Sequence, residues 1–120
     1  MNILLKRAYE AASEDDGFRI LVDRIWPRGV SKDFAHIDFW AKDVTPSTSL
    51  RKWFSHDPLK WEEFKRNYVA ELESRADAVE EFLRLLHQHD KVTFIYGAKD
   101  TKHTHALILQ KYCKDRLEEL

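Results

Sequence analysis

The fold class is decided by residues 18–29, which read FRILVDRIWPRG. The first eight of these residues combine alternating apolar positions with β-branched side chains, a pattern that predicts a buried strand. Pro27 cannot donate a hydrogen bond to a sheet, and it pushes Trp26 into an extended conformation, so the strand is expected to end at Ile25. An Asp16-Gly17 turn signal precedes the run.

Two further apolar runs predict strands, one before and one after this strand in the sequence. Residues 2–8 contain the apolar run Ile3, Leu4 and Leu5 and predict the first strand. Residues 92–96 read VTFIY, a β-branched and aromatic run that predicts the third strand, and Gly97 ends it.

Helical spacing of apolar residues fills much of the chain between these strands. Ser47 is expected to cap a helix whose apolar face carries Leu50 and Phe54. Asp57 followed by Pro58 predicts the start of another helix. The pattern continues, in one helix or two, as far as His89.

Two assignments complete the pattern. A last helix is expected to begin after a cap at Asp100 or Thr101, and the spacing predicts that Cys113 is buried in it. Residues 31–44 fit helical spacing and strand alternation equally well, so both assignments stay open. Strands separated by helices predict an α/β fold, with a small, mostly parallel or mixed sheet covered by helices. The length fits one domain over residues 1–120.

Composition limits the function classes. The chain is 43% hydrophobic and 34% charged, with a formal net charge of −1, so a general attraction to nucleic acid or anionic membrane is not favoured. The single cysteine fits a reducing compartment. No apolar run is long enough for a signal peptide or a membrane span. These features predict a soluble cytoplasmic protein and leave its oligomeric state open.

The residues that follow strands two and three form the candidate site. Open α/β sheets bind ligands beyond the carboxyl ends of their strands. If these two strands are parallel neighbours, the segments that follow them face one crevice. The first segment carries Asp23, Arg24, Trp26 and Arg28, and the second carries Lys99, Asp100, His103 and His105.

This set of side chains favours an anionic small molecule such as a phosphate ester or nucleotide. Arg24, Arg28 and Lys99 would contact the anion, and Trp26 could stack on a flat ligand. His103 is the candidate for proton transfer. Asp100 would cap the helix or orient Lys99. We take His103 and Asp100 as the candidate catalytic residues.

The sequence contains neither known phosphate-binding glycine motif and predicts no cofactor. His103 and His105 would not share a metal ion on a helix, because residues two apart do not face each other. We therefore expect no metal site.

Two alternatives stay open. Asp23 and Asp100 could neutralise Arg24 and Lys99 in a structural salt-bridge network. The chain could also be a non-enzymatic module that binds a protein or nucleic acid, with the charged motifs structural. These patterns do not decide whether the protein is an enzyme.

Several motifs, taken together, span nearly the whole chain. They are LVDRIWPRGVSK at residues 21–32, KDVTPS at 42–47, LRKWF at 50–54, HDP at 56–58 and YGAKD at 96–100. In order and spacing they resemble the YeaO-like family, domain of unknown function 488 (DUF488), including its LVDRLWPRG signature. Thr45 and Thr104 depart from it, because the family often has Ala and Asn there. The resemblance implies a small bacterial-type cytosolic α/β protein and no particular activity.

Overall fold

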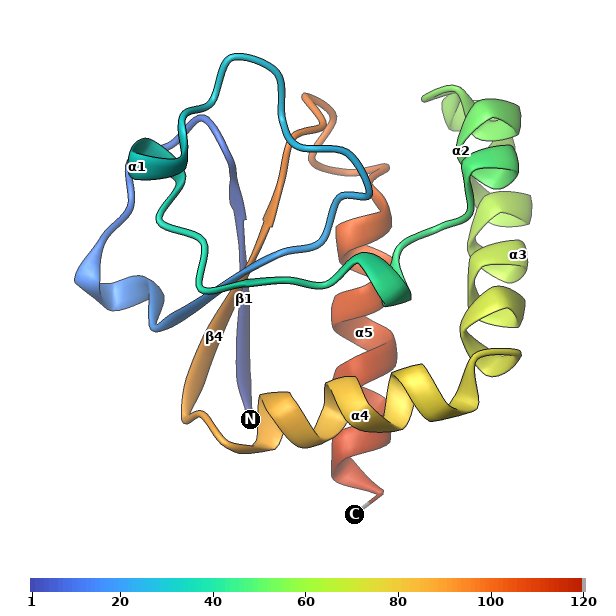
Figure 1. Cartoon of the computed structure of the whole chain (residues 1–120). Helices are drawn as coiled ribbons and strands as arrows, with labels where there is room; N and C mark the ends of the chain where they lie inside the picture. The colour runs from blue at the N-terminus through green and yellow to red at the C-terminus, as the bar shows by residue number, and fades with distance from the viewer. Residues whose placement is uncertain (120) are drawn as a thin grey trace.

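A parallel sheet of four strands organises the chain (Figure 1). In this computed structural model, which describes residues 1–119, the strand order is β1-β4-β2-β3. The strands are β1 (Asn2–Arg7), β2 (Phe18–Leu21), β3 (Phe39–Trp40) and β4 (Lys91–Tyr96). All pairings are parallel, which confirms the α/β fold that the sequence predicts.

Helices and short 3-10 turns connect the strands. They are η1 (Glu14–Asp16), α1 (Lys32–Ala35), η2 (Lys42–Val44), α2 (Thr48–Phe54), η3 (Pro58–Lys60), α3 (Trp61–Glu73), α4 (Ala76–His87) and α5 (His105–Glu118). Two predicted caps are confirmed. The Ser47 side chain accepts a hydrogen bond from the backbone N–H of Leu50, and the Asp57 side chain accepts one from that of Leu59.

The second strand ends at Leu21, so its predicted extension to Ile25 is wrong. The carbonyls of the next two residues accept hydrogen bonds from side chains in place of a neighbouring strand. The Val22 carbonyl lies 2.7 Å from Nε2 of His105, and the Asp23 carbonyl lies 2.6 Å from the indole nitrogen of Trp40. The sheet ladder therefore ends early and frees the segment that follows it.

The last helix begins at His105 after a Thr104 cap, so the predicted cap at Asp100 or Thr101 is wrong. The Asp100 carboxylate accepts hydrogen bonds from the backbone N–H groups of Lys102 and His103, and this closes a separate turn before the helix. Residues 31–44 use both of the patterns left open, since they contain α1, β3 and η2.

The sheet has a large core on one face and a small one on the other. Helices α2–α5 cover the face onto which Val92, Phe94 and Tyr96 project (Figure 1). Ile95 projects to the opposite face and packs in a smaller cluster with Ala35 of α1. Cys113 is buried in the large core as predicted, and burial raises the pKa of its thiol to about 12.

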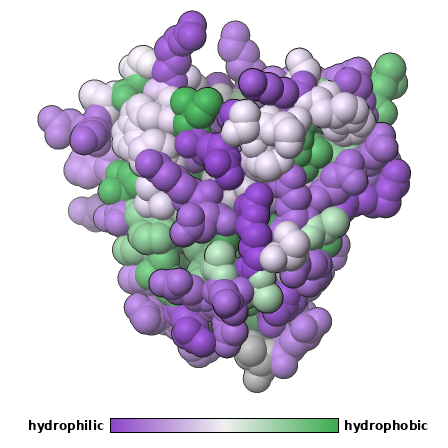
Figure 2. All heavy atoms as spheres, turned by 45° about the vertical axis from the view of Figure 1, so that its right-hand side comes forward, coloured by the Kyte–Doolittle hydropathy of each residue, from purple (hydrophilic) through white to green (hydrophobic). Residues whose placement is uncertain are grey.

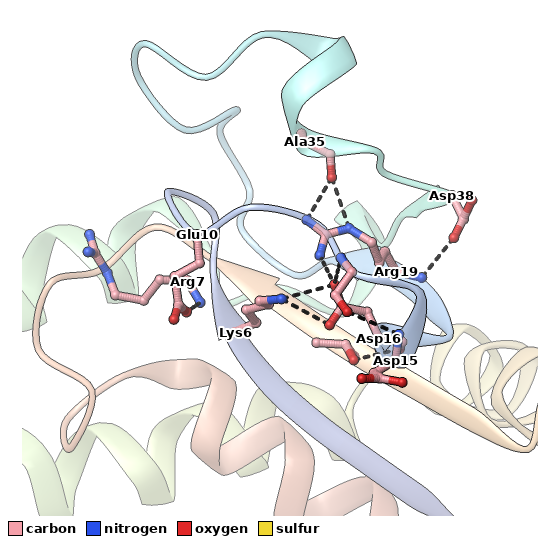
Figure 3. A network of polar contacts seen from close by, with 10 residues as sticks. Lys6, Arg7, Glu10, Asp15, Asp16, Arg19, Ala35 and Asp38 are labelled. Atoms are coloured by element: carbon pink, nitrogen blue, oxygen red, sulfur yellow. Dashed lines mark hydrogen bonds and ion pairs between the residues drawn. The ribbon is translucent and has the colours of Figure 1, made fainter.

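A buried polar network lies on the face with the smaller core (Figure 3). Asp16 accepts a hydrogen bond of 2.6 Å from Arg19 and is paired with Lys6 at 3.1 Å. Arg19 also donates to the carbonyl of Ala35, and Thr93 donates to the carbonyl of Asp16. The network therefore connects β1, η1, β2 and β4 with the end of α1.

Hydrophilic residues dominate the surface when the helices of the large core are turned toward the viewer (Figure 2). None of the helices in residues 1–119 combines the length and the apolar composition that crossing a bilayer requires.

Candidate functional site

A cleft of about 790 Å³ opens at the carboxyl ends of β2 and β4. These strands are parallel neighbours, as the site prediction required, and Phe18–Leu21 pairs with Val92–Ile95. The segments that follow them therefore meet at one end of the sheet, in the upper part of Figure 1. The structure brings all six predicted site residues into the lining of this cleft: Arg24, Trp26, Arg28, Lys99, Asp100 and His103.

Asp23 holds the two segments together. Its Oδ2 atom accepts a hydrogen bond of 2.8 Å from the backbone N–H of Gly97. Its Oδ1 atom lies 3.2 Å from Nε2 of His105, but that nitrogen is closer to the Val22 carbonyl and its hydrogen bond goes there. Oδ1 is consequently buried without a hydrogen bond. Because both neighbours of Nε2 are acceptors, this nitrogen carries the proton of a neutral His105 ring.

Five cationic side chains line the cleft, and they outnumber its two carboxylates. The cations are Arg24, Arg28, Arg51, Lys52 and Lys99, and the carboxylates belong to Asp23 and Asp100. Within residues 1–119, none of the five forms an ion pair. Local positive charge therefore collects here, although the whole chain has a net charge of −1.

The salt-bridge alternative needs pairs that the described residues do not form. Asp23 contacts Gly97 and His105, whereas Arg24 donates through Nε to the carbonyl of Pro46 at 3.2 Å. Asp100 contacts His103 and leaves Lys99 without an ion pair, so the expected orienting contact to Lys99 is wrong. The reason is local, because the turn at residues 100–103 directs the carboxylate back toward its own backbone.

Asp100 and His103 form a hydrogen-bonded pair in the cleft wall. Asp100 Oδ2 lies 2.8 Å from Nδ1 of His103, and the ring packs edge-on against Trp61 at 5.4 Å between centroids. The backbone N–H of Lys102, followed by the His103 side chain, lowers the pKa of the Asp100 carboxyl. Since the ionised carboxylate only accepts, Nδ1 carries a proton, and Nε2 of the neutral ring is left as an acceptor.

The comparisons with known proteins cover nearly the whole chain. A family model described as "Inactive DUF488-N3 subclade" matches residues 2–120. The chain belongs to the YeaO-like DUF488 family. It is 42% identical to "Uncharacterized protein YeaO" of Escherichia coli K12, over 95% of this chain and 98% of the relative. It is 39% identical to "Uncharacterized protein Rv3073c" of Mycobacterium tuberculosis H37Rv, over 95% of each. The search of solved structures gave no significant match.

The DUF488 motifs identified in the sequence form much of the cleft. LVDRIWPRGVSK and YGAKD begin at the last residues of the two central strands, β2 and β4, and provide all of the predicted residues except His103. Sequence reasoning missed Arg51, Lys52 and His56, which come from the end of α2 and the turn after it. The motif LRKWF contains both cations, but nothing in its spacing directs it toward the ends of the strands.

Aromatic side chains form other parts of the lining. Trp26 is half-buried, donates from its indole to the Val30 carbonyl at 2.6 Å, and packs edge-on against Trp40. It therefore closes the smaller core and also borders the cleft. Tyr9, which sequence reasoning missed, is 45% exposed and donates through its hydroxyl to the Arg28 carbonyl at 2.9 Å.

Within residues 1–119, no group of three or more His, Cys, Asp or Glu side chains is arranged to hold a metal ion. His103 and His105 both line the cleft, but each ring is hydrogen-bonded elsewhere, one to Asp100 and the other to Val22.

Proposed function

We propose that the cleft of this DUF488 chain binds an anionic small molecule of the phosphate ester or nucleotide class. The observation that carries the proposal is the set of five cations without ion pairs around one cleft. Unpaired guanidinium and ammonium groups at a concave site bind phosphate through charge-assisted hydrogen bonds. The start of α5, at Thr104 and His105, also borders the cleft, and the positive end of a helix dipole favours an anion.

Arg24, Arg28 and Lys99 would contact the anion, as the sequence predicts. Arg51 and Lys52 would add to them from α2. Trp26 would border the organic part of the ligand. His103 would offer its free Nε2 as an acceptor for a ligand hydroxyl, with Asp100 holding the ring in place.

The description of the matching subclade as inactive supports binding without turnover. If a bound ester were nevertheless cleaved, His103 would be the group to move the proton, because Asp100 fixes the tautomer that leaves Nε2 free. Product analysis after incubation with a chromogenic aryl phosphate separates binding from turnover.

Calorimetric titration of the full chain with sodium pyrophosphate tests the proposal. We expect binding at low salt that Lys99→Ala weakens at least about tenfold, since a hydrogen bond to a charged group contributes roughly 1.5–3 kcal/mol. Arg66→Ala is the matched control, because Arg66 is an exposed cation of α3 that does not line the cleft.

Equal binding by the wild type and Lys99→Ala would contradict an anion site in this cleft. Absence of pyrophosphate binding, together with salt-sensitive binding of an oligonucleotide, would instead favour the non-enzymatic nucleic-acid module.

A further inference from the structure

The cleft is larger than a phosphate group needs. Its volume of about 790 Å³ lies within the roughly 300–1,000 Å³ of sites that enclose drug-sized ligands. The cations come from three separate segments around it, namely the loop after β2, the loop after β4 and α2. A ligand that fills this space therefore has an organic part in addition to its anionic group.

Apolar side chains line the cleft together with these cations, and we call four of them the apolar wall. We define it as Tyr9, Ile25, Pro27 and Ala98, all of which line the cleft. Ile25 is 62% exposed and Tyr9 is 45% exposed, so both present apolar surface to solvent in the absence of a ligand. Inorganic phosphate would leave this surface in water, whereas an apolar ligand group would cover it and gain free energy from its burial.

The aromatic member of the wall is held rigidly. The Tyr9 hydroxyl donates to the carbonyl of Arg28, and the Arg7 guanidinium lies 4.9 Å from the centre of the ring. Arg7 is itself fixed by hydrogen bonds to the carbonyls of Gly97 and Ala98. A preorganised ring loses little conformational entropy when a flat group stacks on it.

Further aromatic side chains, from α2, α3 and the turn after α2, also line the cleft. Phe54 and Phe64 stack at 4.1 Å between ring centroids, and both line the cleft. The exposed imidazole of His56 lies 6.2 Å from Phe54. Phe54 and Phe64 are buried in the large core, so they form an apolar base to this part of the lining, and His56 is the exposed ring beside them.

We propose that the cleft binds a phosphate ester whose organic part is a flat aromatic ring, the class to which mononucleotides belong. This inference rests on the proposed function and restricts it, because it excludes sugar phosphates and free phosphate as preferred ligands. The phosphate contacts the cations, and the ring lies against the apolar wall.

Titration of the full chain with four probes tests the inference. The probes are sodium pyrophosphate, ribose 5-phosphate, adenosine and adenosine 5′-monophosphate. We expect the monophosphate to bind at least about tenfold more tightly than ribose 5-phosphate, since base–aromatic stacking contributes roughly 1–3 kcal/mol. Lys99→Ala should weaken both phosphate esters by a similar factor and leave adenosine unchanged.

Substitutions in the apolar wall give a second, independent readout. Tyr9→Leu should remove most of the preference for the monophosphate over ribose 5-phosphate. Tyr9→Phe is the matched control, because it keeps the ring and loses only the hydroxyl that donates to Arg28. Leu59→Ala should change no affinity, since Leu59 is 96% exposed and does not line the cleft.

Equal affinity for ribose 5-phosphate and the monophosphate would overturn this inference and leave the anion site standing. A preference that survives Tyr9→Leu would overturn the role of the apolar wall. Failure of pyrophosphate and both esters to bind would overturn the proposed function and this inference with it. Tighter binding of a short oligonucleotide than of the monophosphate would show that the surface recognises a polymer, which also overturns the inference.

Discussion

Asp16 is a buried charged residue at the centre of the polar network beside β2. The residue is 6% exposed, and its carboxylate contacts Arg19, Lys6 and the backbone N–H of Ser13 (Figure 3). Burial alone would raise the pKa of this carboxyl, but the hydrogen bonds from Ser13, Lys6 and Arg19 together lower it. The ionised form is therefore the one that the folded state stabilises.

We expect Asp16→Asn to lower the free energy of unfolding by about 3 kcal/mol at neutral pH, because it leaves the buried Arg19 without its counter-charge. A lowered pKa in the folded state gives stability that is present above the unfolded value of about 3.9 and is lost as the pH falls through the folded value. The wild type should therefore lose stability below about pH 4 more steeply than the variant does.

Urea unfolding across this acid range measures both effects. Asp15→Asn is the matched control, because Asp15 is an exposed neighbour in the same turn. Parallel pH profiles for the wild type and Asp16→Asn would contradict the assigned role of the carboxylate.

The sequence could predict the position of those site residues that lie at or just after the end of a strand. Arg28 and Lys99 follow predicted strands, Arg24 lies at the end of one, and parallel pairing brings such segments together. The partner of Asp100 could not be predicted, because it depends on whether the chain after Gly97 forms a helix or a turn. Tyr9 was missed because its place at the cleft depends on the tertiary path of the polar loop after β1.

At the scale of elements, the start of α5 depends on Thr104. Its hydroxyl accepts a hydrogen bond from the backbone N–H of Ala106 at 3.3 Å, and the residue is 2% exposed. In the family pattern that the sequence resembles, Asn often stands at this position, and Asn is at least as good an N-cap as Thr. The departure from the family pattern therefore keeps the same capping chemistry.

We expect Thr104→Ala to lower the free energy of unfolding by about 1 kcal/mol, the usual effect of removing a helix cap. Thr104→Asn should stay close to the wild type, because Asn keeps a side-chain oxygen that accepts the capping hydrogen bond. Thermal and urea unfolding of the two variants measure this difference. An alanine variant as stable as the wild type would show that the hydroxyl does not stabilise the helix.

Several elements were predicted well from their apolar patterns, whereas the end of β2 and the start of α5 were not. The β1 and β4 strands and the α2 helix lie where their patterns place them. The end of β2 was wrong because side chains of His105 and Trp40, distant in sequence, occupy the carbonyls that a longer strand would use. Residues 31–44 could not be assigned to one helix or one strand, because the segment contains three short elements, α1, β3 and η2.

At the scale of the whole molecule, the distribution of charge matters more than its sum. The net charge of −1 predicts little attraction to anions, yet five cations gather at one cleft. Composition could not reveal this arrangement, because it averages over the surface. Electrostatic binding at such a site depends on the local charge and is screened by salt.

We therefore expect pyrophosphate affinity to fall severalfold as potassium chloride rises from about 50 to 300 mM, because the Debye length shortens across this range. Titration at several salt concentrations measures the slope, with an equal osmolality of sucrose as the control. An affinity that does not respond to salt would show that the cations contribute little to binding.

The position of β4 between β1 and β2 has a consequence for how the protein acquires its structure. Asn2 pairs with Lys91, and β1 and β2 do not pair with each other. β1 and β2 are synthesised before β4, so they become part of one sheet only after β4 has been synthesised and pairs with both. Such long-range pairing slows folding relative to helical proteins of similar size, since the closure entropy of a large loop must be overcome first. During this interval the edges of the strands already synthesised have no β4 to pair with, and unpaired strand edges favour aggregation.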